Sequence, residues 1–150
     1  MPKVYRQVNQ WSSPIQEVGD SFYLPGSNPA VDEAMVRFTG RCFEKTTIPS
    51  KPTSVGYKVW VLAQSGYFLR WLWHVQGKGP YGLVSQQRAQ LQRERVVDDS
   101  FTPTQRVVTT LLTLLPLAEY HVFLDNVFAS DGGIDQLLVN EKQDEGKGIP

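Results

Sequence analysis

The chain has a single cysteine, Cys42, among its 150 residues. One thiol cannot form an intramolecular disulfide, and zinc sites built from cysteine pairs are excluded as well. Structural disulfides are typical of oxidising compartments, so this composition indicates a reducing one. We therefore expect Cys42, which lies in a basic stretch, to be an ordinary free thiol.

Long hydrophobic runs are also lacking. The two longest apolar stretches, residues 67–75 and 107–117, are too short or too interrupted to cross a bilayer. Residues 1–16 contain no apolar run that could serve as a signal peptide. The sequence therefore predicts a soluble intracellular protein.

Net charge is absent too, since 15 Lys and Arg balance 15 Asp and Glu. This balance argues against a dedicated basic DNA-binding domain unless the charges are unevenly spread, and they are. Residues 35–60 carry one acid, Glu44, and five basic residues: Arg37, Arg41, Lys45, Lys51 and Lys58. From residue 119 to the end, seven acids face two lysines. The basic stretch permits an anionic ligand, with an ordinary solvated loop as the alternative.

What is present suffices for one folded domain. Hydrophobic residues make up 41% of the chain and charged residues 20%, which is typical of globular proteins. A chain of this length can bury roughly two thirds of the surface that its unfolded form exposes. Folding therefore requires neither a metal nor a disulfide.

Turn-forming residues dominate the beginning of the chain. Residues 1–28 include Pro14 and Gly19, and we expect them to form a lead-in segment of turns and loops. A strand is predicted at residues 31–38. The folded core is expected to span residues 29–140.

Two aromatic and β-branched runs, residues 56–63 and 67–75, flank a short turn around Gly66 and predict a hairpin. Three tryptophans fall on both faces of this hairpin: Trp60, Trp71 and Trp73. They are expected to pack on the two sides of a central sheet, with stacking on nucleic-acid bases as the alternative.

A long polar insertion, residues 77–100, follows the hairpin and is read as a loop or a helix. After it, Thr102 as N-cap, Pro103 in the first turn and Gln105 three residues after the cap form a capping box that starts a helix. Pro116 is expected to end that helix.

The apolar stripe of this helix, between residues 107 and 115, predicts packing against a sheet. A short buried strand is expected at residues 120–124 and a second helix at residues 130–140, ahead of a tail at residues 141–150. The predicted order is strand, hairpin, helix, strand, helix, which indicates an α/β fold with a mixed sheet flanked by helices.

Two histidines, His74 and His121, lie in apolar strands with no second His or Cys at ligand spacing. We expect satisfied core or edge histidines here rather than zinc ligands.

Two carboxylates stand out by position. Asp32 lies inside the first predicted strand, and Asp125 lies at the carboxyl end of the strand after the helix. If these strands are parallel neighbours, both side chains project from adjacent points of one sheet edge and could hold a divalent metal. The ordinary alternative is a turn or cap aspartate. Glu33 would point to the opposite face and is a poor candidate for the same site.

Five blocks of sequence, taken in order, resemble the piggyBac family of transposases. They are residues 29–41 (PAVDEAMVRFTGR), 48–52 (IPSKP), 55–63 (VGYKVWVLA), 65–67 (SGY) and 120–130 (YHVFLDNVFAS). The resemblance covers about residues 20 to 140, and the ordered series is more specific than any one block.

This resemblance implies an incomplete ribonuclease-H-like core that cleaves and joins DNA with a carboxylate triad and Mg²⁺. Asp32 matches the first catalytic, metal-holding aspartate of the family and Asp125 the second, with Asn126 and Phe128 in the block that follows. The resemblance places the basic residues between Arg37 and Lys58 near the DNA backbone. The resemblance also implies transposon ends as the DNA partner and the nucleus as the location. Whether two copies form a homodimer is left open by the sequence.

The chain also departs from the family pattern. The third catalytic aspartate of the family lies far downstream of the second. Acids that follow Asp125 here, among them Asp135, Asp144 and Glu145, do not stand in the matching motif. We therefore expect a transposon-derived core that is inactive alone. The alternative is a non-enzymatic remnant or a host-adopted module that binds DNA or protein.

Overall fold

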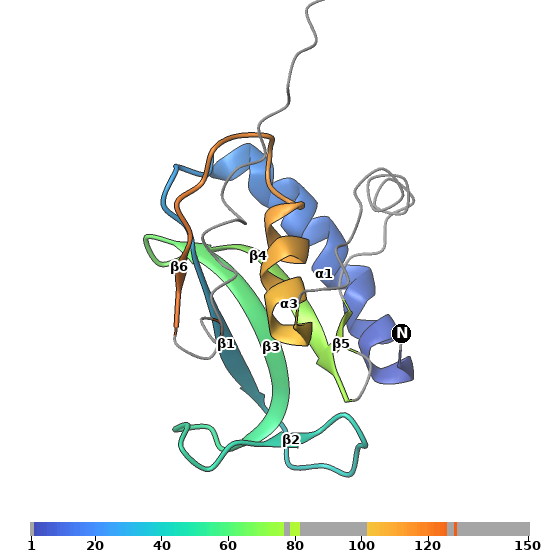
Figure 1. Cartoon of the computed structure of the whole chain (residues 1–150). Helices are drawn as coiled ribbons and strands as arrows, with labels where there is room; N and C mark the ends of the chain where they lie inside the picture. The colour runs from blue at the N-terminus through green and yellow to red at the C-terminus, as the bar shows by residue number, and fades with distance from the viewer. Residues whose placement is uncertain (1, 77–78, 82–101, 126–127, 129–150) are drawn as a thin grey trace, which may run out of the picture.

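The structure is a computed structural model that describes residues 2–76, 79–81, 102–125 and 128. A mixed sheet carries one helix on each face, with α3 in front of the sheet and α1 behind it in Figure 1. The elements in chain order are α1 (Lys3–Phe22), β1 (Ala30–Arg37), β2 (Thr46–Thr47), β3 (Val55–Gln64), β4 (Tyr67–Val75), β5 (Gly79–Tyr81), α3 (Pro103–Leu112) and β6 (Phe123–Leu124). The predicted α/β class with a mixed sheet is confirmed.

The strand order is β5-β4-β3-β1-β6, and β2 pairs with β3 off this path. The pair β1–β6 is parallel, and the other pairs among the described strands are antiparallel. The expected hairpin is β3–β4, and its turn residues Ser65 and Gly66 have φ angles of 50° and 80°. Positive φ at both turn positions matches the right-handed twist of the strands, which explains the glycine there. The predictions of the first strand and of the hairpin are confirmed.

The prediction of turns and loops at the beginning of the chain is wrong, because residues 3–22 form the helix α1. Its buried residues are Tyr5, Ser12 and Gln16, spaced seven and four apart on one helical face. That face is mostly polar, so a search for an apolar stripe toward the core cannot find it. Pro14 lies inside the helix, where contacts with the sheet outweigh its unfavourable propensity.

Polar contacts hold α1 against β4. The Trp71 backbone N–H donates to the Gln16 side chain (3.0 Å), and the Trp71 indole N–H donates to the Ser12 hydroxyl (2.7 Å). The Tyr5 hydroxyl donates to a backbone carbonyl of β4 (2.8 Å), and its ring stacks on Trp73 with centroids 5.2 Å apart. Buried polar groups require hydrogen-bond partners, so these contacts both stabilise α1 on the sheet and fix its position against β4.

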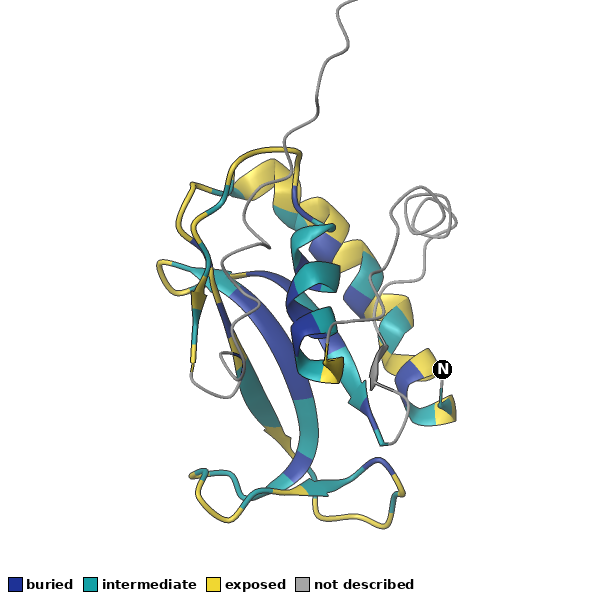
Figure 2. Ribbon diagram, in the orientation of Figure 1, coloured by how far each residue is buried: buried dark blue, intermediate teal, exposed yellow. Residues whose placement is uncertain are grey.

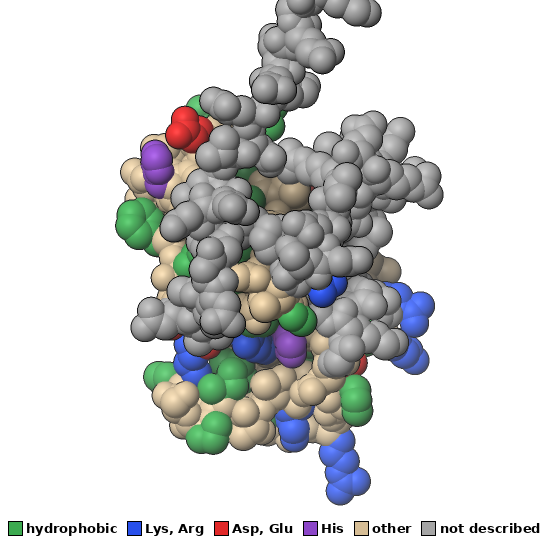
Figure 3. Space-filling model, in the orientation of Figure 1, with side chains coloured by type: hydrophobic (Ala, Val, Ile, Leu, Met, Phe, Trp, Pro, Cys, Tyr) green, Lys and Arg blue, Asp and Glu red, His purple; other side chains and the backbone are tan. Residues whose placement is uncertain are grey.

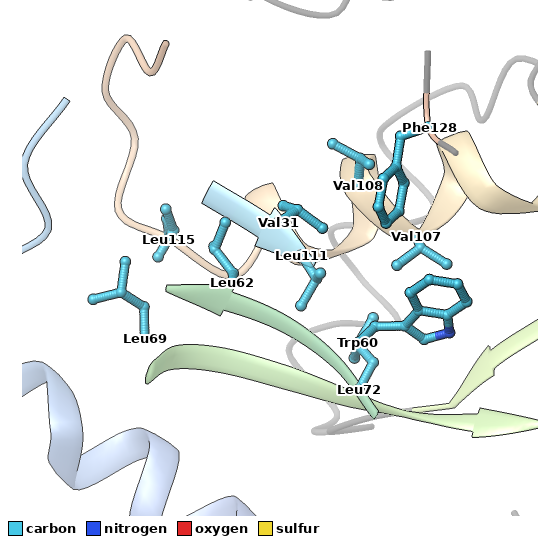
Figure 4. Close-up of a cluster of buried hydrophobic side chains, with 10 residues drawn as sticks. All are labelled: Val31, Trp60, Leu62, Leu69, Leu72, Val107, Val108, Leu111, Leu115 and Phe128. Carbon is cyan, nitrogen blue, oxygen red and sulfur yellow. The ribbon is translucent and has the colours of Figure 1, made fainter. Parts of the chain in front are cut away.

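The hydrophobic core lies between the sheet and α3 (Figures 2 and 4). Its buried side chains come from β1, β3, β4, α3 and the segments after α3: Val31, Trp60, Leu62, Leu69, Leu72, Val107, Val108, Leu111, Leu115 and Phe128. The tryptophans therefore pack on both faces of the sheet as predicted, with Trp60 under α3 and Trp71 and Trp73 under α1.

The capping box that starts α3 is confirmed in both of its hydrogen bonds, from Gln105 N to the Thr102 hydroxyl and from Thr102 N to the Gln105 side chain. The helix ends at Leu112, earlier than the expected stop at Pro116. Tighter turns take over there, since Leu114 and Leu115 donate to the carbonyls of residues 111 and 112.

The strand predicted at residues 120–124 is shorter and less buried than expected. β6 has two residues, and Phe123 is 63% exposed. Among the described strands β6 pairs only with β1, so within this part of the chain it is an edge strand.

The insertion at residues 77–100 is predicted to be a loop or a helix. That prediction is wrong for residues 79–81, which form the strand β5 and pair with β4. The rest of the insertion, the second helix predicted at residues 130–140 and the tail at residues 141–150 lie outside the described residues. Neither described helix is long and apolar enough to span a membrane.

Candidate functional site

The parallel pairing of β1 with β6 creates the candidate site. The paired positions are Ala30 with Phe123 and Val31 with Leu124. Asp32 and Asp125 each follow the last of these pairs by one residue, so the same register sets them side by side. The expectation that the strands of Asp32 and Asp125 are parallel neighbours is confirmed by this pairing.

Alternation along β1 decides which side chains share a face. Val31 is buried in the core beneath α3, so Asp32 points to the other face, where it is exposed. The Asp32 carboxylate accepts a hydrogen bond from the backbone N–H of Glu33 (2.7 Å). Glu33 itself is on the α3 face, as its position beside Asp32 predicts.

Lys51 forms an ion pair with Glu33 and is influenced by the charges of Asp32 and Asp125. Its Nζ lies 3.2 Å from the Glu33 carboxylate in an ion pair. Glu33 raises the pKa of Lys51 through this hydrogen bond and its charge, and Asp32 and Asp125 raise it further through their charges. The Lys51 ammonium therefore lies within electrostatic range of both candidate carboxylates.

Lys58 lies beside this cluster on β3. Its Nζ is 3.8 Å from the centroid of the Trp60 ring, a cation–π contact on the α3 face of the sheet. Burial lowers the pKa of Lys58, and the positive charge of Lys51 lowers it further, whereas Glu33 and Asp32 oppose the shift. Lys58 therefore packs on Trp60 and is less accessible to a ligand than an exposed lysine.

The two aspartates fit a divalent cation in ligand type. Carboxylate oxygens are the hard ligands that Mg²⁺ prefers, and both come from strand ends held by one register. Within the described residues no group of three His, Cys, Asp or Glu side chains could hold a metal ion. A two-carboxylate site with Lys51 nearby is expected to bind such a cation weakly.

The residues that the family resemblance adds around this site fall into two groups. Phe128 is fully buried and packs edge-on against Trp60, with ring centroids 5.7 Å apart, so it supports the core. Outside the described residues lie Asn126, Asp135, Asp144 and Glu145.

The basic stretch of the sequence divides in the structure. Arg37, at the end of β1, and Arg41, in the loop after it, are exposed. Lys45 turns back on its own loop and donates to the Gly40 carbonyl (3.1 Å). In Figure 3, Lys and Arg side chains lie in the middle and lower parts of the molecule, both around β2 and the lower ends of β1 and β3 and on the side of the N-terminal part of α1. Arg37 and Arg41 are therefore the members of this stretch best placed to meet an extended anion.

The two histidines have different environments. His74 is half-buried with its ring edge-on to Trp60, and its Nδ1 has no hydrogen-bond partner among the described residues. The expectation of a satisfied histidine is therefore wrong for His74. Burial lowers its pKa, Lys58 lowers it further, and Glu44 opposes the shift. His121 is exposed in the segment that leads into β6, as an edge histidine would be.

Sequence reasoning missed the cluster formed by Glu33, Lys51, Lys58 and Trp60. Period-two alternation along β3 places Lys58 and Trp60 on one face, so that contact was detectable in principle. The approach of Lys51 was not, because it depends on the path of the loop between β2 and β3. Cys42 is a free thiol, as expected.

Comparisons with known proteins identify the family and the fold of this chain. The family described as Transposase IS4 matches residues 2–142. In a search of solved structures, the chain is similar to the piggyBac transposase of a cryo-EM synaptic complex with hairpin DNA, with 22% sequence identity and a TM-score of 0.53. The match covers 85% of this chain and 25% of that one, so this chain spans about a quarter of its length. A search of curated proteins gave no match. The similarity confirms the fold expected from the resemblance, a partial ribonuclease-H-like sheet.

Proposed function

This chain belongs to the Transposase IS4 family, and from that premise we propose that it is a catalytic-core segment of a cut-and-paste DNA transposase in which Asp32 and Asp125 are metal-holding catalytic residues. The observation that carries the proposal is the parallel β1–β6 pairing, which gives the two carboxylates matching positions on neighbouring strands. Two acids that converge in this way have no evident role in the core, since Asp32 is exposed.

Each residue of the site has a separate task in this proposal. Asp32 and Asp125 provide oxygen ligands, and Mg²⁺ held there would polarise a scissile phosphate and activate an attacking hydroxyl. Lys51, fixed by its ion pair with Glu33, would contact a non-bridging phosphate oxygen as DNA enters. The Lys51 ammonium also interacts electrostatically with both aspartates, so it would lower the affinity of the site for a metal ion. Binding of Lys51 to a phosphate would remove this effect.

Exposed basic residues would hold the DNA. Arg37 and Arg41 are exposed, and guanidinium groups pair readily with phosphates. Contacts of this type are independent of sequence and weaken as salt increases. Lys45 and Lys58 contribute less, because one bonds to its own loop and the other packs on Trp60. The nucleus is the compartment in which such a substrate would be met.

The site is proposed to be catalytically incomplete in this chain. Family chemistry uses three carboxylates, and the sequence has no third aspartate in the matching motif. DNA binding without cleavage is therefore the activity expected of the isolated chain. DNA binding without cleavage is also expected of the second candidate function, a non-enzymatic DNA-binding module. The positive charge of Lys51 near the two carboxylates favours this function, because it can contact a phosphate and opposes metal binding.

Fluorescence anisotropy with a DNA duplex of unrelated sequence tests the proposal. Binding should weaken with salt, and the double variant Arg37→Gln/Arg41→Gln should reduce the slope of log affinity against log salt by about 1.8. The control Arg6→Gln, on α1, should leave the slope unchanged. Absence of binding at low salt, or an equal effect of the control, would contradict the proposed DNA contact.

A plasmid-nicking assay with Mg²⁺ or Mn²⁺ separates the two candidate functions. The chain alone is expected to leave the plasmid intact. Nicking that disappears in Asp32→Asn would instead identify a complete active site and would contradict the proposed incompleteness.

A further inference from the structure

Three nitrogen-bearing side chains on the α3 face of the sheet lack a polar or charged partner within the described part of the chain. Trp60 is only 5% exposed, and its indole N–H has no acceptor there. His74 is half-buried with an unpaired Nδ1, and the half-buried Lys58 forms no ion pair with the described acids. Buried donors without acceptors and buried cations without anions are both unfavourable. This combination fits a ligand that accepts hydrogen bonds and carries negative charge.

The strand register brings the three side chains together. The pairing of β3 with β4 ends at Val59 with Trp73, so Lys58 and His74 occupy the next opposite positions. Alternation along β3 puts Lys58 on the same face as Trp60, and its Nζ lies 3.8 Å from the centroid of the Trp60 ring. The rings of Trp60 and His74 are edge-on, with centroids 5.7 Å apart. The three groups therefore surround one small region of the sheet surface.

The Trp60 ring has an apolar side and a polar side. Its carbon atoms pack in the core, where Phe128 lies edge-on to the ring. In Figure 4 the indole nitrogen lies at the edge of the ring that faces away from Phe128 and Val107. A buried tryptophan usually finds an acceptor for this N–H. The orientation of the ring leaves the N–H available to a polar ligand rather than to the core.

The charges around this cluster leave Lys58 without compensation. Glu33 lies nearby on β1, but its carboxylate is 3.2 Å from the Lys51 Nζ. Glu44 also acts on His74, and its carboxylate accepts a backbone N–H at 3.0 Å. The positive charge of Lys58 lowers the pKa of His74, so it is felt at the imidazole. An anion between Lys58 and His74 would be attracted by a charge that no described carboxylate pairs with.

We propose that Lys58, Trp60 and His74 bind a phosphate group. Phosphate brings negative charge to Lys58 and has several acceptor oxygens, which the indole N–H and an imidazole N–H can share. Lys58 and His74 are half-buried, so a small phosphate reaches them more readily than the side of a duplex does. The ligand is therefore inorganic phosphate or the terminal phosphate of a DNA strand. The flexible Lys58 side chain, which lies over the indole, can follow the anion.

Trp73 provides a comparison within the same sheet. Its indole N–H is also buried and without an acceptor among the described residues. Its ring is on the α1 face, stacked on Tyr5 with centroids 5.2 Å apart, and no described Lys or Arg lies over it. An unpaired indole N–H without a neighbouring cation is not expected to hold an anion. The cation beside Trp60 is what distinguishes the two tryptophans.

Titration of the full 150-residue chain with inorganic phosphate tests the site, with proton–nitrogen correlation NMR of the four tryptophan indole N–H groups as the readout. The Trp60 resonance, identified by its loss in Trp60→Phe, should move downfield and saturate as phosphate is added. The Trp73 resonance, identified with Trp73→Phe, should stay in place. Sodium chloride at the same ionic strength and pH should not reproduce the shift.

Substitutions measure the contribution of each group. Lys58→Met should weaken phosphate binding roughly tenfold or more, because it removes a charge-assisted hydrogen bond. Lys45→Met, on the loop before β2, is the control for the lost charge. Trp60→Phe keeps an aromatic ring in the core and removes only the N–H donor, so it should weaken binding about threefold to tenfold. Trp73→Phe is its matched control and should leave the affinity unchanged. Circular dichroism checks that each variant is folded.

Two oligonucleotides of the same sequence, one ending in a phosphate and the other in a hydroxyl, distinguish the two sources of phosphate. Tighter binding of the phosphorylated strand, reduced by inorganic phosphate and by Lys58→Met, would identify a strand end as the ligand. Equal binding of both strands, together with a Trp60 shift caused by inorganic phosphate, would identify free phosphate. Both outcomes support the site.

Three results would overturn the proposal. They are an unchanged Trp60 resonance at about 20 mM phosphate, an equal shift with chloride, and an equal loss of affinity in Trp73→Phe. The measurements need no divalent cation and alter neither Asp32 nor Asp125. The inference therefore goes beyond the proposed function and fails independently of it.

Discussion

Asp32 and Asp125 follow, by one residue each, the last paired positions of the parallel strands β1 and β6. The chain passes through β3, β4 and α3 between these two strands, so only the completed fold brings the carboxylates together. We propose that they form one site at the ends of these two paired strands.

Replacing Lys51 with methionine should strengthen divalent cation binding. The substitution removes a positive charge that interacts with Asp32 and Asp125, so the local potential becomes more negative. We expect about a two- to tenfold increase in Mn²⁺ affinity by calorimetry. Lys45→Met, a lysine that bonds to the Gly40 carbonyl, is the control and should change little. An unchanged affinity in Lys51→Met would place Lys51 too far from the metal ligands to affect them.

The β-sheet half of this fold follows from sequence pattern more readily than the helix α1 does. The hairpin combines β-branched and aromatic runs with a glycine turn, and the capping box of α3 is local, so each signal lies within a few residues. In α1 the buried positions are mostly polar and the apolar ones are exposed, the reverse of the usual pattern. Its docking depends on hydrogen bonds to Trp71, which a sequence pattern does not encode.

The same distinction applies to the site. Two strand-end aspartates are visible in the sequence, and their convergence follows once β1 and β6 are parallel neighbours. The ion pair of Lys51 with Glu33 was not predictable, because it depends on the course of a loop.

Gln16→Ala should destabilise the protein by about 1–3 kcal/mol, because it leaves the Trp71 backbone N–H without its acceptor beneath α1. Gln10→Ala, at an exposed position of the same helix, is the control and should cost less than about 0.5 kcal/mol. Urea denaturation followed by circular dichroism measures both changes. Equal stabilities for the two variants would show that α1 does not depend on this contact.

Gly56→Ala should disrupt the pairing of β1 with β3. A Cβ at position 56 would lie 2.0 Å from the Val36 carbonyl oxygen, so the strands would have to separate locally. We expect a loss of stability of about 2 kcal/mol or more. Gly26→Ala is the comparison, since its new Cβ would meet the movable Gln64 side chain. The account of this strand pair fails if Gly56→Ala is no less stable than Gly26→Ala.

Stability should fall as the pH drops below about 6.5, and His74 should contribute to this loss. Its folded-state pKa is lowered by burial and by Lys58, so between that pKa and 6.5 the unfolded chain binds more protons than the folded one. His74→Gln should therefore lose less stability than the unaltered chain between pH 7.5 and pH 5. His121→Gln, at an exposed position, should keep the original dependence. Identical pH profiles for the two variants would remove His74 from this explanation.

The most direct test of the central claim is calorimetric titration of the full chain with Mn²⁺, alongside Asp32→Asn, Asp125→Asn and the exposed control Glu17→Gln. Weak binding by the unaltered chain should be reduced roughly tenfold or more by either aspartate substitution and left unchanged by the control. Loss in only one of the two aspartate variants, or no binding by a folded chain, would contradict a shared site at the ends of β1 and β6.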